Sequence, residues 1–214
     1  MIDVAMFTVG VVQENCYLVR PQGGDRAVLV DPGDEAPRLL AAIEAAEVKL
    51  DAILLTHTHF DHVGAVAPVA RATGAPVVCP ELEVPVLQDV MAYVPWPGFG
   101  PFESWDPERT VRGGETLELA GLTFDVLFTP GHSPGHVTYS VRGESALLSG
   151  DVLFRGSIGR DDLPGGDGPT LMRSIAMLLE RFGDETRLLP GHMGTTTLGA
   201  ERATNPFLTA LARR

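Results

Sequence analysis

Short apolar runs bounded by turn residues recur along the first half of the chain and predict β-strands. These runs cover residues 3–9, 15–19, 27–31, 52–55 and 76–79. Residues 35–47 instead have a helical composition, with Pro37 in the first turn, where a helix tolerates proline. Helical spacing resumes near Val63. The first half is therefore expected to alternate strands with helices.

The second half begins with strands and ends with helices. The strands are predicted at residues 115–119, 122–128, 137–142, 145–148 and 187–189. Residues 169–182 have the apolar spacing of an amphipathic helix, and the tail 198–214 is expected to be helical with an interruption near Asn205. Two rounds of strands followed by helices predict an α/β fold, in which two sheets pack face to face with helices outside.

A stretch rich in proline and tryptophan, residues 93–107, breaks this pattern. We expect it to form an ordered irregular loop between the two halves. Its aromatic side chains either cover the hydrophobic core, or belong to a loop that covers a substrate or contacts another subunit. The sequence leaves both readings open.

Composition narrows the classes of function. The length of 214 residues suits a single domain spanning 1–214. The net charge of −12 argues against nucleic acid and anionic membranes as partners, because binding to both depends on Lys and Arg. No apolar run is long enough to cross a membrane, and the N-terminus lacks the basic region of a signal peptide. Cys16 and Cys79 stand in apolar contexts, as buried reduced thiols do, so we expect a cytoplasmic protein.

The histidines carry the clearest chemical signal. The chain has six of them, and all lie in short turns at or just after the end of a predicted strand. The turns are THTHFDH at 56–62, TPGHSPGH at 129–136 and LPGH at 189–192, and a similar turn, SGD at 149–151, carries Asp151. Turns at strand ends are where side chains from distant parts of a chain converge on one site.

These residue types indicate a metal site, because imidazole and carboxylate bind zinc, iron and manganese. His57 and His59, two residues apart, can point the same way in an extended turn. Asp61 and His62 then point elsewhere, as toward a second metal. Two metal sites that share one carboxylate would need all of the candidate ligands, whereas a single four-coordinate site would need fewer. The candidates are His57, His59, Asp61, His62, His132, Asp151 and His192.

The motifs THTHFDH, GHSPGH, SGD and PGH, in this order and each after a strand, resemble those of the metallo-β-lactamase fold superfamily. The resemblance covers nearly the whole chain, including the DPG turn at 31–33. It implies a four-layer αββα sandwich of two mixed β-sheets with helices on the outer faces. It also implies two divalent metal ions, with zinc expected and iron or manganese as alternatives.

The resemblance also implies a role for each candidate. The ligands implied for the first metal are His57, His59 and His132, and those for the second are Asp61, His62 and His192. Asp151 would bridge the two metals. His136 matches no ligand position and is expected to support the ligands or to pack. Asp31 either orients a metal ligand or only caps the DPG turn.

Asp151 separates the branches of this superfamily. The lactamase branches proper place no bridging aspartate there, and the commonest of them uses a cysteine that neither cysteine of this chain matches. The acidic charge speaks against the ribonuclease branch. The stretch LLSGDVLFRGSIGRDDLPGG at 147–166 is similar to the glyoxalase II group, the hydroxyacylglutathione hydrolases. GTTTLGAERATNPFL at 194–208 resembles the short bacterial members of that group.

Two departures put the substrate in doubt. Only the short tail 193–214 follows His192, so the C-terminal helical domain, which supplies basic residues for glutathione in longer members, is not expected. Met193 also stands where those members have an acidic residue. The resemblance therefore supports the type of reaction better than it supports the particular substrate.

The resemblance implies a thioester hydrolase that acts on S-(2-hydroxyacyl)glutathione, or a related thiol ester, through a metal-bound hydroxide. Asp61 and Asp151 are the expected catalytic carboxylates. A thiol with a pKa of about 8.5 can leave without a general acid. Arg155 and Arg160 could meet a carboxylate of the substrate, or they could only brace the loop.

Persulfide dioxygenases are the alternative, since they share a stretch like RGSIGRDD at 155–162. They hold one iron with two histidines and one aspartate. Here those ligands would be His57 or His59, with His132 and Asp151. A binding protein that keeps its metals without turnover is a third reading. The expected partner is a small-molecule substrate, and the chain is expected to act as a monomer or homodimer.

Overall fold

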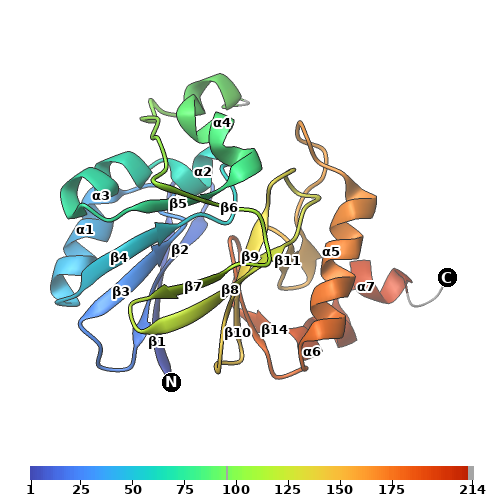
Figure 1. Cartoon of the computed structure of the whole chain (residues 1–214). Helices are drawn as coiled ribbons and strands as arrows, with labels where there is room; N and C mark the ends of the chain where they lie inside the picture. The colour runs from blue at the N-terminus through green and yellow to red at the C-terminus, as the bar shows by residue number, and fades with distance from the viewer. Residues whose placement is uncertain (95, 212–214) are drawn as a thin grey trace.

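The computed structural model describes residues 1–94 and 96–211, in which two six-stranded sheets face each other between outer helices (Figure 1). Pro95 of the predicted loop and residues 212–214 of the predicted tail lie outside the described residues. The four layers confirm the predicted αββα sandwich.

The first sheet has the strand order β1-β2-β3-β4-β5-β6. The first three strands pair antiparallel, and β3 to β6 pair parallel, so the sheet is mixed. The bounds are β1 Ile2–Val9, β2 Glu14–Pro21, β3 Arg26–Val30, β4 Lys49–Leu54, β5 Val77–Pro80 and β6 Arg109–Val111.

The second sheet has the order β14-β13-β10-β9-β8-β7. Only β10 and β13 pair parallel, so this sheet is mixed as well. The bounds are β7 Thr116–Leu119, β8 Leu122–Phe128, β9 Val137–Val141, β10 Ala146–Gly150, β13 Arg187–Pro190 and β14 Thr196–Thr197. A small hairpin, β11 (Leu153–Phe154) and β12 (Ser157–Ile158), follows β10.

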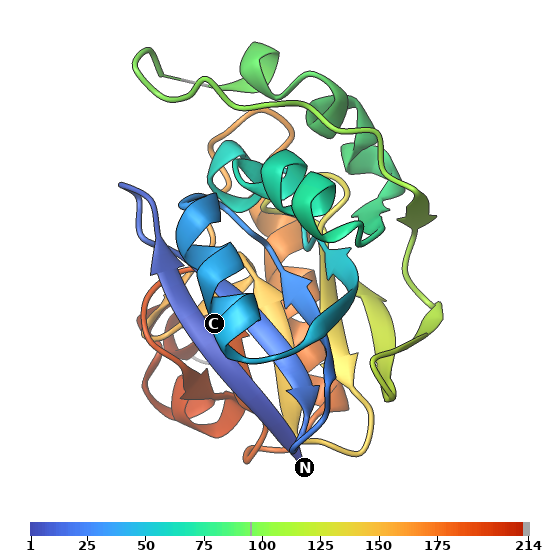
Figure 2. The same ribbon diagram turned by 90° about the vertical axis from the view of Figure 1, so that its left-hand side faces the viewer.

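Helices cover the outer face of each sheet. On the first sheet lie α1 (Ala36–Ala45) and α3 (Val66–Thr73), and on the second lies α5 (Gly168–Arg181) (Figures 1 and 2). The short helices are α2 Phe60–Val63, α4 Val84–Gln88, α6 Leu198–Thr204 and α7 Pro206–Leu211, with 3-10 turns η1 at Glu81–Glu83 and η2 at Val90–Tyr93.

Alternation along the strands explains the layers, because successive side chains of a strand point to opposite faces. Leu29 belongs to the core cluster beneath α1 and α3, whereas its neighbours Val28 and Val30 belong to the cluster between the two sheets. In β10, Leu147 faces the cluster beneath α5 and Leu148 faces the inner cluster. Three apolar interfaces therefore hold four layers together.

The elements that the sequence did not predict are short. They are β6, β11, β12 and β14, together with the helical turns between residues 81 and 93. A strand of two or three residues has no hydrophobic period of its own, and it forms because tertiary packing brings it to a partner.

Strands β8, β10 and β13 run in the same direction, since β8 and β10 each pair antiparallel with β9 and β13 pairs parallel with β10. The turns that carry His132, Asp151 and His192 follow their carboxyl ends and so meet at one edge of the sandwich. Within residues 1–94 and 96–211, no helix is long and apolar enough to cross a membrane.

Candidate metal centre

The loop after β4 is held by Asp31, which follows β3. Thr56 donates two hydrogen bonds to this carboxylate, from its backbone nitrogen to Oδ1 at 2.7 Å and from its hydroxyl to Oδ2 at 2.6 Å. The Thr56 hydroxyl also lies 3.0 Å from His57 Nδ1. With Nδ1 occupied in this way, Nε2 of His57 is the nitrogen left to face the site.

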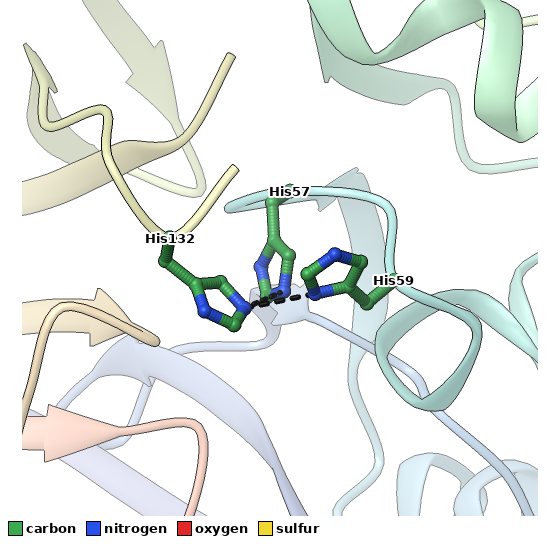
Figure 3. A group of neighbouring side chains, drawn as sticks. All are labelled: His57, His59 and His132. Atoms are coloured by element: carbon green, nitrogen blue, oxygen red, sulfur yellow. Dashed lines mark hydrogen bonds between the residues drawn. The ribbon is translucent and has the colours of Figure 1, made fainter. Parts of the chain in front are cut away.

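Three imidazoles converge at this loop (Figure 3). Nε2 of His132 lies 2.8 Å from His59 Nδ1 and 3.2 Å from His57 Nε2. The other ring nitrogen of His132 donates to the backbone oxygen of Arg160 at 2.8 Å, which fixes the direction of the ring. Ligands of a tetrahedral zinc lie about 3.3 Å apart, given Zn–N bonds of about 2.0–2.1 Å. The three nitrogens are therefore spaced as ligands of one ion.

A second group lies beside the first. Nε2 of His192 is 3.2 Å from Asp61 Oδ2, and Nε2 of His62 is 3.9 Å from the same oxygen. Nδ1 of His62 lies 3.1 Å from Asp31 Oδ2, so this carboxylate orients the ring. Asp31 thus contacts both the first ligand loop and His62.

Asp151 lies between the two groups. Its Oδ1 is 3.4 Å from His62 Nε2, while its Oδ2 is 3.4 Å from His132 Nε2 and 3.5 Å from His192 Nε2. Its backbone nitrogen donates to His136 Nε2 at 3.0 Å. His136 is fully buried and contacts Thr129 through its other ring nitrogen, so it supports Asp151 from behind.

Glycine is required next to this cluster. A Cβ atom at Gly191 would overlap Asp151 Oδ1 and come within 2.6 Å of His62 Cε1. The PGH turn can therefore bring His192 to the site only with glycine before it.

Burial favours the neutral form of His57 and His59 in the first group. It lowers the pKa of His57 well below the usual value, and neighbouring imidazoles add to the effect. Burial likewise lowers the pKa of His59 to about 3. A metal binds the neutral ring, so these side chains stand in the form that ligates.

The carboxylates of the centre stay ionised. Burial alone would raise the pKa of Asp151, but the nearby rings of His62 and His192 lower it well below the usual range. The pKa of Asp61 is lowered as well, because His62 and His192 outweigh its burial. Burial would lower the pKa of His62 and of His192, but the carboxylates of Asp151 and Asp61 raise both pKa values above the usual one. A metal ion that binds the second group must therefore displace a proton from these rings.

Two buried atoms of the centre, His62 Nε2 and Asp151 Oδ1, have no hydrogen-bond partner among the described residues. An unpartnered buried polar atom costs about 1–3 kcal/mol, so a further group is expected there. Three sets of side chains are spaced to hold an ion, and together they include six of the predicted ligands. The sets are His57 with His59 and His132, Asp31 with His57 and His62, and Asp61 with His62 and His192. The donors and the unpartnered atoms fit divalent metal ions.

The two predicted arginines lie in different surroundings. Arg160 donates to both oxygens of Asp162, at 2.6 and 2.9 Å, and lies 5.7 Å from the ring of Trp96. Arg155 makes no ion pair with any described residue. With Arg187 it lines an open cleft of about 800 Å³, whose lining includes none of the predicted metal ligands.

Sequence reasoning missed two buried glutamates beside the centre. Glu14 is fully buried, and its Oε1 lies 3.8 Å from His62 Nδ1. An acidic residue at the start of the buried strand β2 is a sequence signal that could have identified Glu14 as a residue of the centre. Glu83 is 3% exposed and contacts both histidine loops, although nothing in PELEVP distinguishes it from the half-buried Glu81.

The comparisons with known proteins agree with this geometry. The family model of the Metallo-beta-lactamase superfamily matches residues 9–192. The chain therefore belongs to the metallo-β-lactamase superfamily, and it is a metallo-hydrolase by class.

Two bacterial relatives extend over nearly the whole chain. Hydroxyacylglutathione hydrolase GloC of Haemophilus influenzae is 35% identical over 208 residues, covering 96% of this chain and 98% of its own length. The probable metallo-hydrolase YqgX of Bacillus subtilis is 36% identical over 205 residues, or 94% of each chain.

Solved structures show the same fold. The BLEG-1 B3 metallo-beta-lactamase superposes with a TM-score of 0.90 at 37% identity, covering 98% of this chain and 100% of its own. TTHA1623 in a di-iron-bound form has a TM-score of 0.86 at 46% identity, with coverage of 96% and 100%. ETHE1 from Myxococcus xanthus has a TM-score of 0.78 at 25% identity, with coverage of 97% and 85%.

Proposed function

We propose that this metallo-hydrolase is a thioester hydrolase of the glyoxalase II type, acting on a small-molecule S-(2-hydroxyacyl)glutathione or a related thiol ester. The observation that carries the proposal is the place of Asp151, with Oδ1 toward His62 and Oδ2 toward His132 and His192. A carboxylate in this position could contact two metal ions at once, and a two-metal site can stabilise both the attacking and the leaving group of a hydrolysis. Similarity to the relative named hydroxyacylglutathione hydrolase supports the choice of substrate.

The proposed cofactors are two divalent ions. His57, His59 and His132 would hold one, Asp61, His62 and His192 would hold the other, and Asp151 would contact both. Zinc is the proposed metal, with iron as the alternative because one similar structure was solved in a di-iron form. Such ions would supply hydroxide at neutral pH and polarise the thioester carbonyl.

The side chains of the protein have positioning and proton-handling roles in this reaction. Asp31 keeps Nε2 of His62 aimed at the site by contacting Nδ1. Burial would raise the pKa of Asp61, but His62 and His192 lower it, so its carboxylate stays ionised. We propose that the carboxylate oxygen that does not hold a metal would accept a proton from the attacking water. The leaving thiolate needs no general acid, since free thiols have a pKa of about 8.5.

Arg155 is the proposed contact for a carboxylate of the thiol carrier. It lies in the open cleft without an ion-pair partner in the described part of the chain, so it is available to a ligand. Arg160 would have to leave Asp162 before it could take the same role.

The experiment that tests the function measures thiol release from S-lactoylglutathione by metal-loaded protein, with a chelator-treated sample as the control. Rapid release that the chelator abolishes is the expected result. No release from this substrate or from other thiol esters would overturn the proposal. A β-lactam should be assayed in parallel, because one similar structure is named a B3 metallo-beta-lactamase.

Persulfide dioxygenase activity is the second candidate, favoured by the similarity to ETHE1 from Myxococcus xanthus. That reaction needs one iron and consumes oxygen. Metal stoichiometry and oxygen uptake with glutathione persulfide separate the two candidates. One iron per chain together with oxygen uptake would replace the hydrolase with the dioxygenase.

A further inference from the structure

Glu83 lies in the 3-10 turn η1, directly after β5, and its side chain is buried between the two histidine loops. It accepts a hydrogen bond from the hydroxyl of Thr58 at 2.8 Å, from the hydroxyl of Ser133 at 2.7 Å and from the backbone nitrogen of Gly135 at 2.7 Å. Each of the three donors belongs to a ligand loop.

The two carboxylate oxygens divide between the loops. Among the residues that the structure describes, Oε2 accepts only from Thr58, which stands between His57 and His59. Oε1 accepts from Ser133 and Gly135, which follow His132. One oxygen therefore holds the loop after β4, and the other holds the loop after β8.

The second ligand group has further anchors, one of which it shares with the first, since Asp31 also accepts from Thr56. Asp31 holds the ring of His62. Asn15 holds the turn of His192, donating to the backbone oxygens of Pro190 at 3.1 Å and Met193 at 2.8 Å. Glu83 makes no hydrogen bond to any residue of this second group among residues 1–94 and 96–211.

We propose that Glu83 is a positioning residue for one metal site alone: it sets the distance between the His57–His59 pair and His132. A carboxylate is suited to this role because it has no donor that could face the three protons, and its charge strengthens each hydrogen bond. The inference rests on the proposed metal site and not on the choice of substrate.

The test replaces Glu83 with glutamine and uses Glu81→Gln as the matched control, because Glu81 lies in the same turn but pairs on the surface with Arg112. The amide of Glu83→Gln must turn its NH₂ toward the donors of one loop. Metal content is measured by mass spectrometry, and the affinity of each site by titration with Zn²⁺ and Co²⁺, whose absorption reports coordination.

We expect Glu83→Gln to weaken the metal affinity of the site formed by His57, His59 and His132 by about 10–100-fold. That is the usual effect of losing a group that orients ligands. The other site should change by less than about 3-fold, and Glu81→Gln should bind like the unaltered protein. An equal loss at both sites would mean a general loosening of the fold and would overturn the proposal. Unchanged affinity at both sites would overturn it too.

If Glu83→Gln fails to fold, variants that remove a single hydrogen bond to Glu83 still test the proposal. Thr58→Val frees only Oε2, and Ser133→Ala removes one of the two donors to Oε1. Each should shift the Co²⁺ spectrum of the same site, and loss from the other site would contradict the inference. Because the readout is metal binding, the result stands even if thioester hydrolysis proves to be the wrong reaction.

Discussion

Asp151 presents one carboxylate oxygen to His62 and the other to His132 and His192, so a single side chain links both ligand groups. Its ionisation depends on the imidazoles around it, because burial alone would raise the pKa of the carboxyl. The ionisation of the centre therefore depends on side chains that lie far apart in sequence, because each charged group shifts the pKa of its neighbours.

Asp151→Asn should abolish metal-dependent turnover while most of the fold remains. The neutral amide cannot bridge two cations, so activity should fall by at least about 100-fold, more than replacement of an orienting group usually costs. Steady-state kinetics on metal-replete protein measures this, with the exposed Asp161→Asn as the control. Activity retained in the variant would refute the bridging role.

In the metal-free protein, His59 should stay neutral down to a pH of about 3, since burial lowers the pKa of its ring. An unfolded histidine takes a proton at a pH of about 6.5, so stability is full above that value and declines as the pH falls toward the folded pKa. NMR titration of the ring nitrogens measures the pKa. Titration near 6.5 would contradict this prediction, and His59→Gln should lessen the acid sensitivity.

At the scale of elements, the loop 93–107 covers the core, as one of its two predicted roles required, while its role toward a substrate or another subunit stays a prediction. Phe99, Phe102 and Trp105 pack against the core beneath α1 and α3. Trp96 is 41% exposed, and its ring lies 6.1 Å from Phe60 and 5.7 Å from Arg160. Because Phe60 adjoins the ligands of α2, this part of the loop lies beside the centre.

The two tryptophans of this loop should respond differently to alanine. Trp105→Ala should lower the free energy of unfolding by about 2 kcal/mol, because it removes a large, partly buried side chain that packs against the core. Trp96→Ala should leave the free energy of unfolding nearly unchanged and raise KM several-fold, because it removes an exposed ring that packs on Phe60 beside the ligands of α2. Urea unfolding and steady-state kinetics measure both. If Trp96→Ala raises KM no more than Trp105→Ala does, the loop only covers the core.

At the scale of the whole molecule, metal binding should couple the two halves. The centre takes His57 and Asp61 from the first sheet's side and His132 and Asp151 from the second's, so an ion there links both sheets. Ligands that bind only the folded state stabilise it by mass action.

Metal removal should therefore lower Tm. At a metal concentration 100-fold above Kd, the stabilisation is about 2.7 kcal/mol, which corresponds to a shift of about 5–10 °C for a chain of this size. Calorimetry on chelated and zinc-loaded protein measures the shift, with Mg²⁺ as a control ion that prefers oxygen ligands. A shift of the same size with Mg²⁺ would point to screening of the acidic surface instead.

Much of the fold followed from local pattern. Strands of five or more residues, such as β3 and β8, and the amphipathic helix α5 stood where alternation and helical spacing predicted them. The short strands β6 and β14 did not, because pairing across the sandwich creates them and local preference does not. The predicted αββα layers are confirmed, whereas the cytoplasmic location and the oligomeric state stay predictions.

By itself the sequence determined which side chains could bind a metal, because their chemistry and their turns at strand ends are local features of THTHFDH, GHSPGH, SGD and PGH. Tertiary structure alone decided what supports them. The sequence left Asp31 between two roles, and only the fold shows its contact with His62. Glu83 could not be told from a surface acid by sequence, and only the fold shows its hydrogen bonds with Thr58 and Ser133. A carboxylate takes its role from its neighbours, and neighbours from distant parts of a chain exist only after folding.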